Sequence, residues 1–155
     1  MKTYIHYGAK AFIPELFVPI QNRYFVKPQG GLWASPVNAE YGWKEWNTDR
    51  HYVEIIDEIS FKFTLKEDAK IIHIYSVYDL ESLPKEKMPD IPNFDSAMVF
   101  LDFEALMKQG YDAIELHFSE EDRSNVDFMK GLYWSLYGWD CDSILIMNPN
   151  VIVCK

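Results

Sequence analysis

The sequence predicts a single α+β domain with a central antiparallel or mixed sheet and a few flanking helices. Two observations predict this class: some stretches alternate apolar and polar residues, as half-buried strands do, while others place apolar residues at helical spacing. The length of 155 residues is that of one ordinary domain, and no linker or internal repeat interrupts it. We therefore expect residues 1–155 to fold as one domain, long enough to build its own core.

Extended segments are expected on both sides of the chain's midpoint. The clearest lies at 58–65, where Phe61 and Phe63 alternate with Lys62 and Thr64. The other expected strands are residues 3–7, 32–35, 69–75, 111–118 and 143–147, with a final extended run at 151–153.

Helices are expected where capping residues precede a helical pattern. Ser35 and Pro36 suit the start of a helix over 37–46, because serine caps a helix well and proline fits its first position. Gly110 suits the end of a helix over 100–109. Further helices are expected at 76–83 and, with an amphipathic pattern, at 124–137; residues 84–93, with three prolines, are expected to be a loop.

Composition and charge limit the possible partners. The net charge of −9 gives no overall attraction for nucleic acid, whose binders usually carry a basic face. No apolar run approaches the roughly 20 residues of a membrane span, and the start lacks a signal-peptide pattern, so we expect a cytoplasmic protein without a membrane partner. Cys141 and Cys154 are expected to be reduced thiols.

His6 and Gly8 form the first candidate site, at the end of the opening strand. An imidazole beside a glycine can bond a ligand that approaches the backbone closely. The alternative is a histidine with a purely structural hydrogen bond.

A second candidate follows the Gly30–Gly31 turn. Glycines let backbone amides approach a ligand, Trp33 could stack on a flat ring, and Ser35 could donate a hydrogen bond beside it. The alternative is a tight turn followed by a core tryptophan.

Acidic residues provide a third candidate. Asp142, with Asp140 beside it, stands at the mouth of an apolar strand, where a carboxylate can stabilise a developing cation; solvated acids are the alternative. Glu115 and Asp140 are the alternative candidates for the acidic site residue. We expect no metal at His73 and His117, because the chain has no His-x-x-x-His or Cys-x-x-Cys spacing.

Taken in order, these stretches resemble the ADP-ribosyltransferase superfamily over nearly the whole chain. Its members open on a strand bearing histidine, continue through a glycine-rich turn into an aromatic-x-Ser/Thr strand, and end with an acidic residue near a late strand. The matching residues here are His6, Gly8, Gly31, Trp33, Ser35 and Asp142.

The resemblance implies NAD as substrate and a role for each matching residue. His6 would bond a ribose hydroxyl, the Gly8 backbone would hold the carboxamide, and Trp33 would stack on nicotinamide. Ser35 would support the site, and Asp142 would bind the ribose as its oxocarbenium character grows. The acceptor, whether protein, nucleic acid or small molecule, stays open, and small enzymes of this kind resemble phage or bacterial toxin and defence factors. The alternative is a nucleotide-binding or protein-interaction module without turnover.

Overall fold

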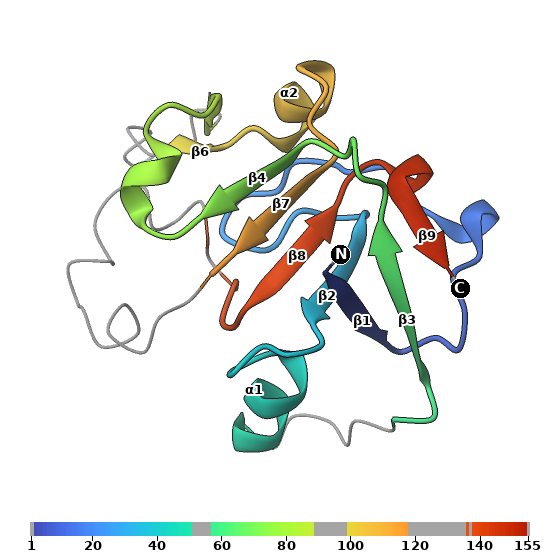
Figure 1. The fold of residues 1–155 in the computed structure, drawn as a ribbon. Helices are drawn as coiled ribbons and strands as arrows, with labels where there is room; N and C mark the ends of the chain where they lie inside the picture. The colour runs from blue at the N-terminus through green and yellow to red at the C-terminus, as the bar shows by residue number, and fades with distance from the viewer. Residues whose placement is uncertain (1, 51–56, 89–98, 118–135, 137, 155) are drawn as a thin grey trace.

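The computed structural model describes residues 2–50, 57–88, 99–117, 136 and 138–154. Within these residues the fold is α+β, mostly sheet with two α-helices (Figure 1). The main sheet holds β1 (Thr3–Tyr7), β2 (Leu32–Pro36), β3 (Ser60–Leu65), β4 (Ile71–Ile74), β7 (Ala113–Leu116), β8 (Ser143–Ile146) and β9 (Ile152–Cys154). The other elements are the β5 (Lys85–Lys87) and β6 (Val99–Leu101) pair, α1 (Trp43–Arg50), α2 (Phe103–Lys108), and the 3-10 turns η1 (Pro14–Leu16), η2 (Val77–Leu80) and η5 (Pro149–Val151).

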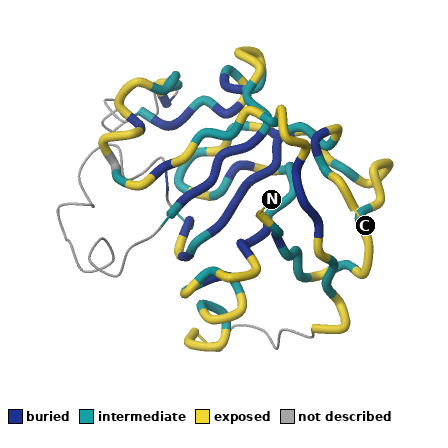
Figure 2. The backbone as a smooth tube through the Cα atoms, in the orientation of Figure 1, coloured by how far each residue is buried: buried dark blue, intermediate teal, exposed yellow. Residues whose placement is uncertain are grey.

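The main sheet is mixed, which is one of the two arrangements that the sequence predicts. Its order is β4-β7-β8-β2-β1-β3-β9, and only the β4–β7 pair is parallel. Strands from both ends of the chain therefore meet in the middle of the sheet, where β8 pairs with β2 and β2 with β1. The dark blue strands of Figure 2 show that burial is greatest along β7 and β8, where every residue is buried.

Each face of the sheet carries its own hydrophobic cluster. On one face, the side chains of Ile114 and Leu145 pack with Trp139 and with Phe103 of α2. On the other, those of Ile144 and Ile146 pack with Tyr4 and Phe63. Because successive side chains of a strand point to opposite faces, each residue's place in the register fixes the cluster that it joins.

Both described α-helices begin later than the sequence pattern predicts. Pro36 ends β2 instead of opening a helix, and α1 begins only at Trp43. Ser35 nevertheless acts on that helix, because its Oγ accepts a hydrogen bond from the Trp43 amide at 2.9 Å. In the second case residues 99–101 pair with β5, and Asp102 caps α2 by accepting from the Ala105 amide.

The other predicted elements agree with the structure only in part. The strand at 111–118 is shorter, Ala113–Leu116, and the helix at 76–83 is only the 3-10 turn η2. The expected loop at 84–93 contains β5. The amphipathic helix at 124–137 falls almost wholly outside the described residues. Both cysteines are free, as predicted, and no described helix is long and apolar enough to cross a membrane.

Candidate functional site

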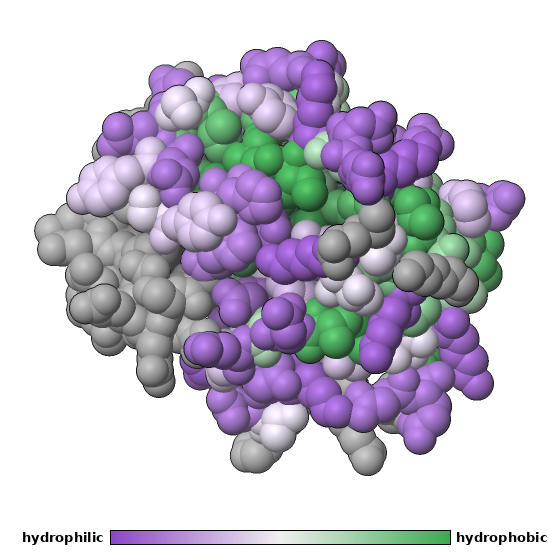
Figure 3. All heavy atoms as spheres, viewed as in Figure 1, coloured by the Kyte–Doolittle hydropathy of each residue, from purple (hydrophilic) through white to green (hydrophobic). Residues whose placement is uncertain are grey.

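A small apolar pocket of about 180 Å³ lies beside the end of β1. The segment that follows β1 supplies much of its wall, including Phe12 and Phe17, and β3 supplies Phe61. Hydrophobic surface near η1 stays open to solvent in this region: Leu16 is 73% exposed (Figure 3, right edge). The full lining is His6, Ala9, Ala11, Phe12, Ile13, Leu16, Phe17, Gly31, Leu32 and Phe61.

His6 is the one ionisable side chain in this lining, among the residues that the structure describes. Its Nδ1 lies 2.7 Å from the carbonyl oxygen of Trp33, and its ring lies 5.2 Å from that of Phe61, centroid to centroid. A carbonyl oxygen can only accept, so Nδ1 carries the proton in this bond. In the neutral ring, Nε2 is then an acceptor.

The predicted glycines mainly serve the fold. The Gly8 amide donates to the carbonyl of Ile59 at 2.8 Å, and the Gly31 amide donates to the carbonyl of Val18 at 2.8 Å. Gly31 has φ +68°, and a side chain there would meet Leu145 Cδ1 at 2.5 Å. Both amides that we expected to face a ligand are therefore engaged within the protein, although Gly31 does line the pocket with His6.

Trp33 does not join His6 in one pocket, contrary to the expected nicotinamide stack. Ile5 pairs with Ser35, so their side chains lie on one face of the sheet, and Trp33, two residues before Ser35, lies on the same face. His6 follows Ile5 and therefore points to the opposite face. The Trp33 ring packs edge-on against Trp139, with centroids 4.6 Å apart. The register of β1 against β2 therefore decides that these two side chains do not share a pocket.

Ser35 and Asp142 are joined through the backbone of Asp142. Ser35 is 2% exposed, and its Oγ donates to the Asp142 carbonyl oxygen at 2.9 Å while it accepts from Trp43. The Asp142 amide donates to the carbonyl of Tyr41. This hydroxyl therefore fastens α1 to the start of β8, and it is not among the pocket-lining groups.

Lys27 covers the tryptophan cluster on the face opposite His6. Its Nζ lies 3.5 Å from the ring centroid of Trp43 and 5.0 Å from that of Trp33. Burial lowers the pKa of the Lys27 ammonium to about 8, and the charges of Cys141 and Asp140 offset part of that shift. The indole faces also favour the cation, which limits the effect of burial.

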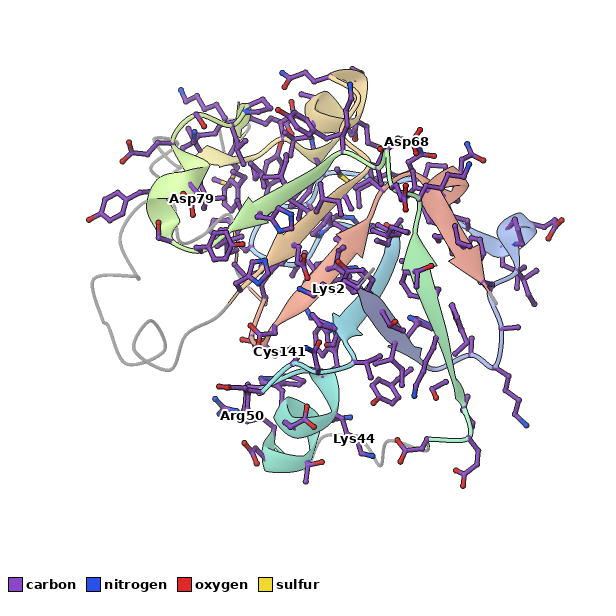
Figure 4. The ribbon with its side chains drawn as sticks, in the orientation of Figure 1. Lys2, Lys44, Arg50, Asp68, Asp79 and Cys141 are labelled. Carbon is purple, nitrogen blue, oxygen red and sulfur yellow. The ribbon has the colours of Figure 1, made fainter. Side chains whose placement is uncertain are left out.

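A polar cluster lies on the same face as His6, centred on Glu115. This carboxylate is 0% exposed, and its Oε1 lies 2.6 Å from Lys2 Nζ. Its Oε2 accepts from the Tyr4 hydroxyl at 3.3 Å. Lys2 reaches over the sheet near β8 (Figure 4), and hydrophilic residues gather over the middle of this face (Figure 3).

Two imidazoles complete the polar cluster. His73 Nδ1 lies 3.3 Å from Glu115 Oε2, and His117 Nε2 lies 3.7 Å from it. The ring of Tyr75 stacks on His117 at 4.4 Å with an interplanar angle of 9°. Burial lowers the pKa of His117, and Lys2 and His73 act in the same direction, while Glu115 and Asp142 raise it.

Burial also raises the pKa of Tyr4, and the charge of Glu115 and its hydrogen bond act in the same direction. The phenol of Tyr4 therefore stays protonated and remains a donor to the carboxylate.

These polar residues lie far apart in the sequence, and their separate patterns did not indicate the cluster. The available signal was the alternation of Glu115 with His117 on one strand face, together with His73 on another apolar strand. Only the parallel pairing of β4 with β7 places His73 opposite Glu115 and so brings the three side chains together.

Comparisons with protein-family models, with curated proteins and with solved structures found no match.

Proposed function

We propose that this chain binds NAD through its nicotinamide-ribose half, with the flat ring in the His6 pocket. Apolar pockets with few polar groups are the usual form of small-molecule sites, and three phenylalanines line this one. Phe12 and Phe61 have ring centroids 6.4 Å apart, which makes one wall of the pocket aromatic.

The single observation that carries the proposal is the 2.7 Å bond between His6 Nδ1 and the Trp33 carbonyl. This bond fixes the ring of a residue that lines the pocket, and in the neutral imidazole it leaves Nε2 as an acceptor. A ribose hydroxyl is a donor that matches it. The contact also gives Trp33 a role through its backbone in place of the indole stacking that the resemblance implies.

A calorimetric titration with NAD and, separately, with nicotinamide tests the proposal. We expect saturable binding of NAD and a loss of about tenfold in affinity for His6→Ala, which removes the proposed acceptor of the ribose hydroxyl bond. Lys62→Ala is the matched control, because Lys62 is exposed and lies next to Phe61 on β3, on the other face. Absence of NAD binding by the wild-type chain, or equal binding by His6→Ala, would overturn the proposal.

ADP-ribosyl transfer from the bound NAD is the second candidate. It is favoured by the carboxylate of Glu115, which lies on the same sheet face as His6, beside Tyr4. In this reaction the bond between nicotinamide and ribose breaks, and nicotinamide leaves with the electron pair. An oxygen or nitrogen nucleophile of the acceptor then bonds to the anomeric carbon and loses its proton. A nearby carboxylate lowers the barrier by stabilising the cationic transition state.

Release of nicotinamide from NAD by the purified protein tests this second function. Release that falls in Asp142→Ala or Glu115→Gln would support transfer and identify the acidic residue. Saturable NAD binding without release, with added protein or nucleic acid acceptors as well as without them, would reject transfer and leave a nucleotide-binding module.

A further inference from the structure

We infer that His73, Glu115 and His117 form a binding site for a divalent transition-metal ion, with zinc as the ion that fits best. None of its three residues lines the His6 pocket, and metal binding is measured without NAD, although Glu115 is also an acidic candidate for the second function. Its three ligand atoms, Nδ1, Oε2 and Nε2 respectively, all lie within 4.8 Å of one another.

The spacing of the three atoms matches a tetrahedral ion. Nδ1 of His73 lies 3.1 Å from Nε2 of His117, 3.3 Å separates Nδ1 from Oε2, and 3.7 Å separates Nε2 from Oε2. Zinc bound at 2.0–2.1 Å in a tetrahedron sets its ligand atoms about 3.3 Å apart. An octahedral ion with bonds of about 2.1 Å sets neighbouring ligands about 3.0 Å apart. The ligand atoms therefore need little movement to close around a tetrahedral ion.

The chemistry of the donors points to the same class of ion. Two imidazole nitrogens and one carboxylate oxygen suit zinc and its neighbours in the first transition row. Magnesium and calcium prefer oxygen ligands. Three protein ligands leave the fourth tetrahedral position for water, as in zinc sites that react with a substrate.

The surroundings hold the ligands in place. Lys2 binds the other oxygen of Glu115, and such outer contacts orient a metal-binding carboxylate. The stacked ring of Tyr75 sets the plane of His117. The β4–β7 register fixes His73 opposite Glu115. In the metal-free protein an N–H···N bond joins the two imidazoles, so one of the two ligand nitrogens carries a proton. Metal binding must displace this proton, which is released or moves to the other nitrogen of its ring.

The site is also accessible. The side chains of His73 and His117 are 42% and 26% exposed, whereas that of Glu115 is fully buried. An ion can therefore approach from the imidazole side and bind against the carboxylate.

Cobalt(II) is a useful probe, because tetrahedral Co²⁺ absorbs visible light far more strongly than octahedral Co²⁺. We expect the wild-type protein, freed of metal by a chelator, to give an intense visible spectrum with Co²⁺ that Zn²⁺ abolishes. Removing a ligand with His117→Ala or His73→Ala should weaken zinc affinity by about 100-fold or more, since even changes at outer residues cost 10- to 100-fold.

Cys154→Ser is the matched control. Cys154 lies outside the site, and its exposed thiol could bind the same metals. Its spectrum should equal that of the wild type. Glu115→Gln removes the charge with little change of shape and is the third ligand variant. Because Glu115 is buried, its variant can fail to fold. The test then depends on His73→Ala, at an exposed position, and His117→Ala, at a half-buried one.

Thermal melting gives a second readout that does not rely on colour. Zinc should raise the melting temperature of the wild type and of Cys154→Ser, because an ion that binds the folded state stabilises it. It should leave that of the histidine variants unchanged. A weak octahedral spectrum, or a spectrum and a melting shift that persist in both histidine variants, would overturn the proposed site.

Discussion

Nδ1 of His73 lies 3.3 Å from Oε2 of Glu115, across the parallel pair of strands β4 and β7. The two residues are register partners, although the strands β5 and β6, the 3-10 turn η2 and the helix α2 lie between them along the chain. A buried carboxylate with several polar neighbours gives this face of the sheet a charge-dependent core. The contribution of these polar contacts to the free energy of unfolding can be measured without any ligand.

The ion pair between Lys2 and Glu115 is the first part to test. Lys2→Met should lower the free energy of unfolding by about 1–3 kcal/mol, because it leaves a buried carboxylate without its ammonium partner. We expect less than the loss seen for fully buried pairs, since the Lys2 side chain is 39% exposed. Urea denaturation measures the change.

The double variant Lys2→Met with Glu115→Gln provides the control for this pair. It should be more stable than the sum of the two single effects predicts, because no unpaired charge then remains buried. Strict additivity would show that the two groups do not interact in solution.

Gly31 is expected to tolerate no side chain. Gly31→Ala combines a positive φ with a contact of 2.5 Å to Leu145 Cδ1 and of 2.9 Å to the Ile146 carbonyl oxygen. Gly110→Ala is the matched control, because φ is +84° there but the nearest atom lies 3.9 Å away. The control should lose about 1 kcal/mol and Gly31→Ala about 2 kcal/mol more. Equal losses in chemical denaturation would mean that the crowding at Gly31 is relieved.

Ser35 should contribute to stability through its two hydrogen bonds. Ser35→Ala leaves the Trp43 amide and the Asp142 carbonyl without this partner, at a cost of about 1–3 kcal/mol. Thr48→Ala is a suitable comparison, because the Thr48 hydroxyl bonds the Lys44 carbonyl on the exposed side of α1. That variant should change the free energy of unfolding by less than about 0.5 kcal/mol. A similar small effect for Ser35→Ala would show that water replaces the hydroxyl.

Lys27 should make stability depend on pH in the alkaline range. Its pKa is about 8 in the folded protein against the ordinary lysine value of 10.5, so between these values the unfolded chain binds more protons. The contribution of this residue to the free energy of unfolding therefore rises with pH across that window. Below pH 8 both states are protonated, and the cost of burying the charge is fully present.

Lys27→Met removes this cost. The variant should be about 1–3 kcal/mol more stable than the wild type at pH 7, after allowing for the lost attraction between the cation and the indoles. Its advantage should shrink as the pH rises from 8 toward 10.5. Denaturation curves across this range measure the difference, and an advantage that does not change with pH would contradict the assigned shift.

The sequence by itself determined the local features of this protein. The alternation at 58–65 predicts β3, because a strand with one buried face needs a period of two. Gly110, with a positive φ just beyond α2, closes the helix where the pattern predicts its end. These features depend on neighbours within a few residues, so they can be read along the chain.

Only the tertiary structure decided which side chains meet. Pairing Ile5 with Ser35 puts Trp33 on the face opposite His6, and pairing Ile72 with Ile114 brings His73 to Glu115. A shift of one residue in either register would reverse these faces. Register is set by packing between strands that are far apart in the sequence, and for this reason the local pattern that predicts each strand leaves its partners undetermined.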